Sequence, residues 1–171
     1  MSGVDKTAMS SNNGFDLRLI RGRMQLISAL RAHLESVDFT EVQTPLLQSR
    51  LSGFETGTGF STYSASLGER LWFRAAPELY LKRLLVKGRE AGLERVFELA
   101  VCARDELDEQ APRESFDRPE FTLLELYTGA DDPDSLEGLL RELVEQGVAR
   151  LEAEGLLPQE AASAVSRLRG P

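Results

Sequence analysis

Six charged and aromatic residues, grouped in three short segments, are of types that could bind an anion and a cation side by side. They are, in chain order, Glu78, Arg104, Glu106, Phe121, Glu125 and Tyr127. An arginine can clamp a phosphate or carboxylate with its planar fork. An aromatic ring offers a base a stacking surface, and a carboxylate accepts hydrogen bonds from an ammonium group. The set could therefore hold a zwitterionic amino acid and a nucleoside triphosphate.

Most of these residues also have a purely structural interpretation. Arg104 and Glu106 could form a surface salt bridge at a strand end, worth about 0–1 kcal/mol. Phe121 and Tyr127 could be ordinary core residues. Glu125 favours a binding role, because a carboxylate between two aromatic rings on one strand face is rarely buried without a partner. The pattern predicts that Glu125 binds a cation.

Two alternating segments predict the strands that position these groups. Residues 95–104 would place the even-numbered side chains, Arg104 included, on one face. Residues 121–127 would place the two rings and the carboxylate on one face. The polar segment 107–118 predicts a loop that joins the two strands as antiparallel neighbours.

Helices are predicted at residues 17–37, 77–87 and 135–156. The first and third carry apolar residues at spacings of three and four. In the second, Pro77 suits the first turn and Gly88 the C-terminal cap, and the carboxylate of Glu78 would complement the helix dipole. The remaining elements expected are a short strand at 39–43, a loop or hairpin at 50–68 and a strand stub at 72–74.

The fold class predicted from these elements is α+β. An antiparallel sheet centred on residues 95–104 and 120–128 would be flanked by the helices 17–37 and 77–87. We expect a disordered leader at 1–13, one domain at 14–156 and a C-terminal tail at 157–171.

Composition argues against several function classes. The 171 residues are 42% hydrophobic and 28% charged, and none of the apolar runs reaches the ~20 residues of a membrane span. A single cysteine, Cys102, excludes an internal disulfide and fits the cytoplasm. One histidine, His33, makes histidine acid–base catalysis or a His/Cys zinc site improbable, and we assign no metal ligands. The net charge of -8 argues against strong nucleic-acid binding.

Several segments resemble class II aminoacyl-tRNA synthetases. Residues 39–45, Phe-Thr-Glu-Val-Gln-Thr-Pro, are similar to motif 1, which builds the dimer interface of that family. Residues 97–106 and 119–127 are similar to the two strands of motif 2. The segment 76–85 and Glu125-Leu126-Tyr127 resemble most the lysyl branch of the Asp/Asn/Lys group. The resemblance covers roughly residues 17–143 and implies an incomplete class II catalytic core, since no segment resembles motif 3.

The resemblance implies a role for each candidate residue. Arg104 would be catalytic, contacting the α-phosphate of ATP and the amino-acid carboxylate while an aminoacyl-adenylate forms with Mg²⁺. The other implied roles are Glu106 at the adenine amino group, Phe121 on the adenine ring, Glu78 and Glu125 at the α-ammonium, Tyr127 at a side-chain ammonium and Gly53 in a loop that closes over the substrate.

Departures from the family pattern keep alternatives open. Asp117 stands where the lysyl branch has a histidine, and the motif 2 loop is acidic. The anticodon-binding barrel is not found either, which makes the chain similar to the stand-alone lysine ligase of elongation factor P. We expect weak activity unless a homodimer or another polypeptide completes the site, with tRNA or a protein as acceptor. The alternatives are a non-catalytic binding module and an aspartyl-type ligand.

Overall fold

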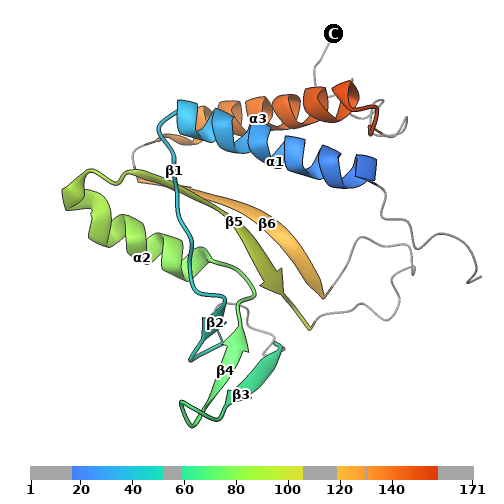
Figure 1. Cartoon of the computed structure of the whole chain (residues 1–171). Coiled ribbons are helices and arrows are strands. Elements are labelled where there is room, and N and C mark those ends of the chain that lie inside the picture. Colours follow the sequence, from blue (N-terminus) through green and yellow to red (C-terminus); the bar gives the residue numbers. More distant parts are fainter. Residues whose placement is uncertain (1–16, 52–58, 106–118, 130, 158–171) are drawn as a thin grey trace, which may run out of the picture. The chain divides into compact units, whose positions relative to one another are not determined.

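The computed structural model describes residues 17–51, 59–105, 119–129 and 131–157. The described residues between 34 and 136 form one compact unit, and the described residues before 34 and after 136 form the other. In chain order the elements (Figure 1) are α1 (Leu17–Ser36), β1 (Thr40–Glu41), β2 (Leu47–Gln48), β3 (Ser61–Ser64), β4 (Glu69–Phe73), α2 (Glu78–Gly88), the 3-10 helix η2 (Arg89–Ala91), β5 (Arg95–Ala103), β6 (Glu120–Thr128) and α3 (Pro133–Ala153). None of the described helices is long and apolar enough to cross a membrane.

The main sheet contains the predicted antiparallel pair β5–β6. Its ladder runs without a break from Arg95 opposite Thr128 to Ala103 opposite Glu120. The short strand β1 lies on the other side of β5 and pairs with it in parallel. The described sheet is therefore mixed, which corrects the purely antiparallel expectation. Parallel pairing requires a crossover connection, and the stretch from β1 to β5, which includes α2, supplies it.

A second small sheet has the strand order β2-β4-β3. Strands β3 and β4 form an antiparallel hairpin from Ser61 opposite Trp72 to Ser64 opposite Glu69. Gly68 adopts a positive φ of 68° in the turn, a conformation that glycine tolerates without strain. In the described part of residues 50–68, the hairpin alternative is therefore correct, and the expected strand stub is the end of β4.

Helix α2 packs on β5 and β6 through a face that contains the fully buried Leu81. Its C-terminal end differs from the prediction. Gly88 has a φ of -85° and leads directly into η2, and Gly92, with a φ of 81°, ends that turn. Gly88 is needed for another reason: a Cβ there would lie 2.7 Å from Cδ2 of Leu93. It is a close-approach glycine rather than a cap.

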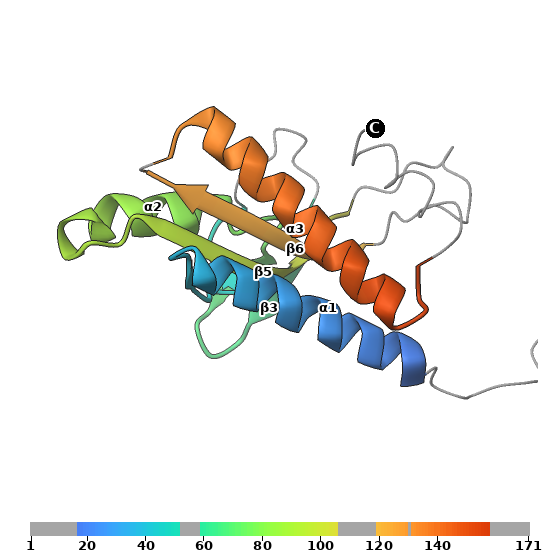
Figure 2. The ribbon, with the colours of Figure 1, turned by 90° about the horizontal axis from the view of Figure 1, so that it is seen from above.

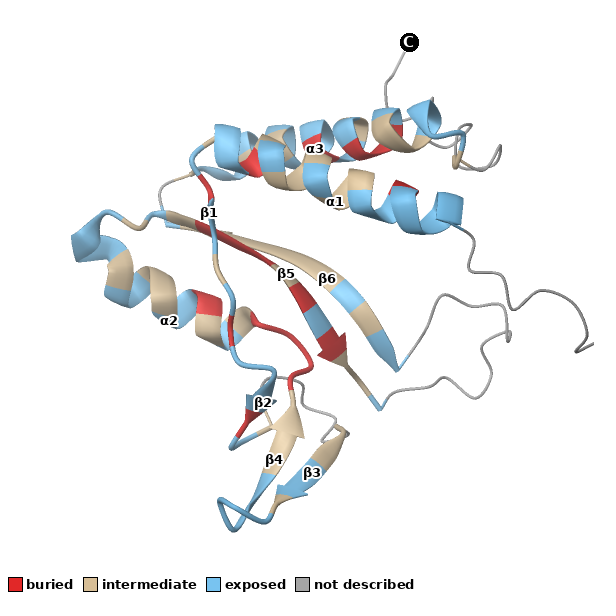
Figure 3. Cartoon of the chain, in the orientation of Figure 1, coloured by how far each residue is buried: buried red, intermediate tan, exposed pale blue. Residues whose placement is uncertain are grey.

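Strand β5 is the most buried strand of the main sheet (Figure 3). Phe97 on one face is fully buried, as are Val96, Ala100 and Cys102 on the other. This fits the central position of β5 between β1 and β6. Groups carried by β5 are thus held in a fixed framework.

The other unit consists mainly of α1 and α3, which lie side by side (Figures 1 and 2). Gly147 of α3 is buried and lets Cδ1 of Leu26 approach to 3.1 Å from the position of a Cβ. His33, the histidine of the chain, places Nε2 3.3 Å from Oε2 of Glu142. Both helices were predicted, and α3 ends earlier than expected, just before Gly155 with its positive φ of 64°. Packing of the 17–37 helix on the sheet stays a prediction.

Two glycine substitutions test these packing arguments. Gly88→Ala is expected to lower the free energy of unfolding by about 1–3 kcal/mol, because the new methyl group overpacks against Leu93. Gly138→Ala, in α3 with nothing within 4 Å of the new Cβ, is expected to raise it by about 0.5–1 kcal/mol through helix propensity. Urea unfolding followed by circular dichroism measures both. Changes of the same sign would contradict the close-approach role of Gly88.

Candidate functional site

The register of the β5–β6 ladder places most of the candidate side chains on one face of the sheet. Residues directly opposite in an antiparallel pair point to the same face. The relevant pairs are Cys102 with Phe121, Glu98 with Glu125 and Val96 with Tyr127. The even-numbered side chains of β5 therefore lie on the same surface as Phe121, Glu125 and Tyr127 of β6.

Arg104 and Phe121 come together at one end of this surface. The guanidinium carbon of Arg104 lies 4.9 Å from the centroid of the Phe121 ring, within the range of a cation–π contact. Nε of Arg104 donates to the backbone oxygen of Ala75 at 3.2 Å. The backbone nitrogen of Arg104 donates to the oxygen of Pro119 at 2.9 Å. An anion-binding fork and an aromatic ring are therefore adjacent, as the predicted nucleotide site requires.

Glu125 lies farther along β6 with half of its carboxylate unused. Oε1 accepts a hydrogen bond from the hydroxyl of Tyr127 at 3.1 Å. Oε2 is buried and has no hydrogen-bond partner among the described residues. Burial raises the pKa of Glu125, and the hydrogen bond from Tyr127 opposes this rise. A buried acceptor without a partner is costly. This oxygen is therefore suited to accept a hydrogen bond from a ligand.

Helix α2 brings a second carboxylate to the same place. Glu78, in the first turn, pairs with Lys82 one turn later. The ammonium of Lys82 lies 5.6 Å from the centroid of the Tyr127 ring. Burial, followed by the charge and hydrogen bond of Glu125 and those of Glu78, raises the pKa of the Tyr127 phenol. Tyr127 therefore stays protonated and remains a donor between two carboxylates.

The family resemblance implied the grouping of Glu78 with Glu125 and Tyr127, and the structure brings the three side chains together, but Lys82 was missed. The signal was available, because a lysine four residues after a helical glutamate faces it. Both members of the pair are partly exposed, with side-chain exposures of 52% for Lys82 and 33% for Glu78. Pairs of this kind contribute little to stability, so a ligand can displace this one at small cost.

A second missed feature is a buried ion pair between Arg74 and Glu98. The two residues are 5% and 2% exposed, and Nη1 of Arg74 lies 2.5 Å from Oε1 of Glu98. The hydroxyl of Thr44 donates to Oε2 of Glu98 at 2.8 Å and accepts from Nη1 of Arg74 at 2.8 Å. In the predicted strand, Glu98 lies on the same face as Arg104. Because a buried charge needs a partner, this placement already indicated a cation near Glu98.

The remaining candidates are placed as follows. Cys102 is buried, and burial raises the pKa of its thiol although Arg74 and Arg104 oppose the rise. Gly53, Glu106 and Asp117 lie outside the described residues, so their assignments stay predictions.

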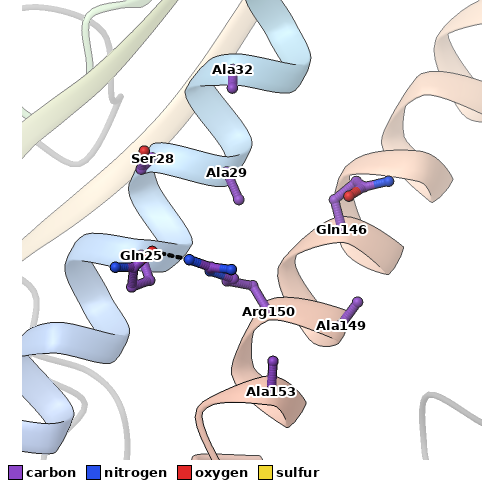
Figure 4. A pocket seen from close by; sticks show the side chains of 8 residues that line it. All are labelled: Gln25, Ser28, Ala29, Ala32, Gln146, Ala149, Arg150 and Ala153. Atoms are coloured by element: carbon purple, nitrogen blue, oxygen red, sulfur yellow. Dashed lines mark hydrogen bonds between the residues drawn. The ribbon is translucent and has the colours of Figure 1, made fainter.

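A groove of about 390 Å³ lies between α1 and α3 (Figure 4). It is lined mainly by small side chains such as Ala29, Ala32 and Ala149, and Arg150 reaches across it to Oε1 of Gln25. None of the candidate site residues lines it. The groove reflects the small side chains at this helix contact and adds nothing to the site on the sheet.

The family description "tRNA synthetases class II (D, K and N)" matches residues 6–168 of this chain. The chain is 36% identical over 134 residues to lysine–tRNA ligase cla4 of Cladosporium cladosporioides, covering 78% of this chain and 21% of that protein. It is 40% identical over 126 residues to the lysine–tRNA ligase of Kineococcus radiotolerans, covering 74% and 23%. For the lysine–tRNA ligase of Baumannia cicadellinicola the identity is 39% over 124 residues, covering 72% and 22%. The chain thus spans about a fifth to a quarter of the length of these relatives.

Glu98 and Glu125 are cross-strand neighbours, yet we expect opposite effects from substituting them. At neutral pH Glu98→Gln lowers the free energy of unfolding by about 3–5 kcal/mol, since it leaves the buried Arg74 unpaired. Glu125→Gln raises the free energy of unfolding by about 0.5–2 kcal/mol, because it removes a buried charge that lacks a full set of partners.

The gain from Glu125→Gln should also depend on pH. Burial raises the pKa of Glu125 in the folded state, so its ionised form destabilises the protein above that pKa. As the pH falls through the folded pKa toward the unfolded value, the wild-type carboxyl is protonated and the penalty disappears. Urea unfolding between pH 4 and pH 8 tests this. A gain that grows as the pH falls would contradict the assignment.

Proposed function

The chain belongs to the class II tRNA synthetases of the D, K and N group, and from this we propose that its sheet face binds lysine and ATP and joins them as lysyl-adenylate. The observation that carries the proposal is the buried, unpartnered Oε2 of Glu125. It lies on the same face as Phe121, the ring that Arg104 covers. A cation acceptor and an anion clamp on one surface match the two ends of an amino acid together with a phosphate.

The amino acid would bind through the two carboxylates. Glu78 and Glu125 would accept from the α-ammonium group, and Tyr127 would help to recognise the ammonium of the side chain. The ammonium of Lys82 already lies beside Glu78 and over the ring of Tyr127, which supports the suitability of this cluster for ammonium groups. The relatives named above are lysine–tRNA ligases, and this favours lysine over aspartate.

The nucleotide would bind at the Arg104 end. Phe121 would stack on adenine, and Glu106, outside the described residues, would accept from its amino group. The carboxylate oxygen of lysine attacks the α-phosphorus of ATP, the bond to the bridging oxygen breaks, and pyrophosphate leaves. Arg104 would stabilise the charge that develops on the α-phosphate, an effect typically worth about 3–4 kcal/mol. Mg²⁺ would accompany ATP and neutralise part of the phosphate charge, and no described residue is assigned to it.

The acceptor of the activated lysine is a separate part of the proposal. A tRNA acceptor is favoured by the relatives, whereas the net charge of -8 weighs against tight tRNA binding by this chain alone. The second candidate function is a binding module that takes up lysine and ATP without joining them. The unused oxygen of Glu125 supports binding in both cases, so a measurement of catalysis separates them.

Calorimetry with amino acids in the presence of ATP tests the binding step. We expect lysine to bind more tightly than aspartate. Glu125→Gln should weaken lysine binding by roughly 10- to 100-fold, because a hydrogen bond to a charged group contributes about 1.5–3 kcal/mol. Glu120→Gln is the matched control, since Glu120 is exposed at the start of the same strand with the opposite parity. Tighter binding of aspartate would refute the lysine assignment, and equal losses in the two variants would refute the role of Glu125 in amino-acid binding.

Lysine-dependent exchange of pyrophosphate into ATP tests the chemical step. Arg104→Ala should reduce the exchange rate by about 10²- to 10³-fold, the usual loss for one electrostatic stabiliser. Arg70→Ala should leave it unchanged, because the Arg70 side chain bonds Ser61 at an exposed position of the hairpin. Wild-type binding of both ligands without exchange would favour the binding module over the ligase.

A further inference from the structure

We propose that Arg74 is a positioning residue that fixes the orientation of Arg104 through the backbone of Arg74 and Ala75. The orientation concerns the free chain and can be tested whether or not the ligands bind. Its consequence for ATP affinity rests on the proposed function.

The strand β1 covers only part of one edge of β5. The nitrogen of Val42 donates to the oxygen of Phe97 at 2.9 Å, so the backbone groups of odd-numbered β5 residues face the β1 side. β1 pairs only with Val96 and Phe97. Farther along this edge, the oxygen of Val101 and the nitrogen of Ala103 need other partners.

Arg74 supplies both partners. Its Nε donates to the oxygen of Val101 at 2.8 Å, and its own backbone oxygen accepts from the nitrogen of Ala103 at 2.9 Å. The backbone nitrogen of Arg74 donates to the oxygen of Leu46 at 2.9 Å. Arg74 is therefore held by main-chain and side-chain bonds at once and runs along β5 in place of β1.

The guanidinium is locked from its other end as well. Nη1 donates to the oxygen of Thr44 at 2.8 Å and lies 2.5 Å from Oε1 of Glu98. The carboxylate of Glu98 is held in turn by the nitrogen and hydroxyl of Thr44, at 3.2 and 2.8 Å. Nε and Nη1 of Arg74 thus donate to Val101, Thr44 and Glu98 in different directions, which holds the guanidinium in a defined orientation.

The orientation of the Arg104 side chain depends on Ala75, the residue that follows Arg74. The oxygen of Ala75 accepts from Nε of Arg104 at 3.2 Å, and this bond sets the direction of the fork over the Phe121 ring. Ala75 is itself buried and comes directly after the locked Arg74. Through this backbone the buried pair determines where the Arg104 fork points.

Stability alone does not account for the pair. Burying two charges is costly, and apolar residues of similar volume often serve a core equally well. What an apolar pair cannot do is donate to Val101 and Thr44. Arg95 provides a matched control at the opposite end of β5, because it also pairs with a carboxylate, Asp131, and donates to a backbone oxygen, that of Val37.

The experiment follows the Nε–H of Arg104 by ¹H–¹⁵N NMR, with the signal assigned by its loss in Arg104→Lys. The test variant is Arg74→Met with Glu98→Leu, which removes both buried charges together and is the combination most compatible with folding. We expect the Arg104 Nε–H to exchange with water about tenfold faster in this variant, the scale of one lost hydrogen bond. In Arg95→Met its exchange should change by less than about twofold, as for a distant site.

Arg74→Lys provides a second arm, because it keeps a charge beside Glu98 but lacks the planar fork. We expect the same faster exchange of Arg104 Nε–H, together with ATP affinity about tenfold weaker in both Arg74 variants than in Arg95→Met. Exchange that matches the wild type in either Arg74 variant, or equal acceleration in Arg95→Met, would overturn the proposal. A wild-type chain that binds no ATP would refute the proposed function, and the exchange rates would still decide the positioning role.

Discussion

The buried ion pair between Arg74 and Glu98 is the constraint on which the rest of the sheet face depends. It joins three segments that are distant in sequence, because Thr44 bonds both partners across separations of 30 and 54 residues. Such a pair gains little net stability, since desolvation of two charges offsets most of their attraction. Its contribution is geometric. With Arg74 fixed, the turn into α2 and the end of β5 have one relative arrangement, and the carboxylates of the site share that frame.

Charge also explains why Glu98 and Glu125 behave differently although they are direct cross-strand neighbours. Two like charges in this relation repel each other. Arg74 neutralises the charge of Glu98, and Thr44 donates further hydrogen bonds to the Glu98 carboxylate. Glu125 receives a single bond from Tyr127 and keeps one oxygen unpaired. The fold thus satisfies one carboxylate for structure and leaves the other incomplete, the kind of local cost that is found at binding sites.

Local patterns in the sequence predicted what depends on local periodicity. Alternation in β5 and β6 assigned Glu125 and Tyr127 to one face, and the ladder register confirmed it. Features set by distant partners were not predictable in this way. The two-residue β1 pairs in parallel through a long crossover, and the ion pair links β5 to a residue outside the recognisable strand. The cap predicted at Gly88 is wrong because a helical sequence pattern does not reveal the close approach of Leu93.

The preformed site has a consequence for how a cationic ligand would bind in the proposed function. Glu78 already has Lys82 as a partner, but both are partly exposed, so exchanging that ammonium for another gains little. Glu125 is different, because its carboxylate was desolvated when the chain folded. A ligand ammonium that reaches Oε2 restores a hydrogen bond without having to desolvate the acceptor. Affinity for the α-ammonium should therefore come mainly from Glu125, while Glu78 and Lys82 adjust the local charge around it.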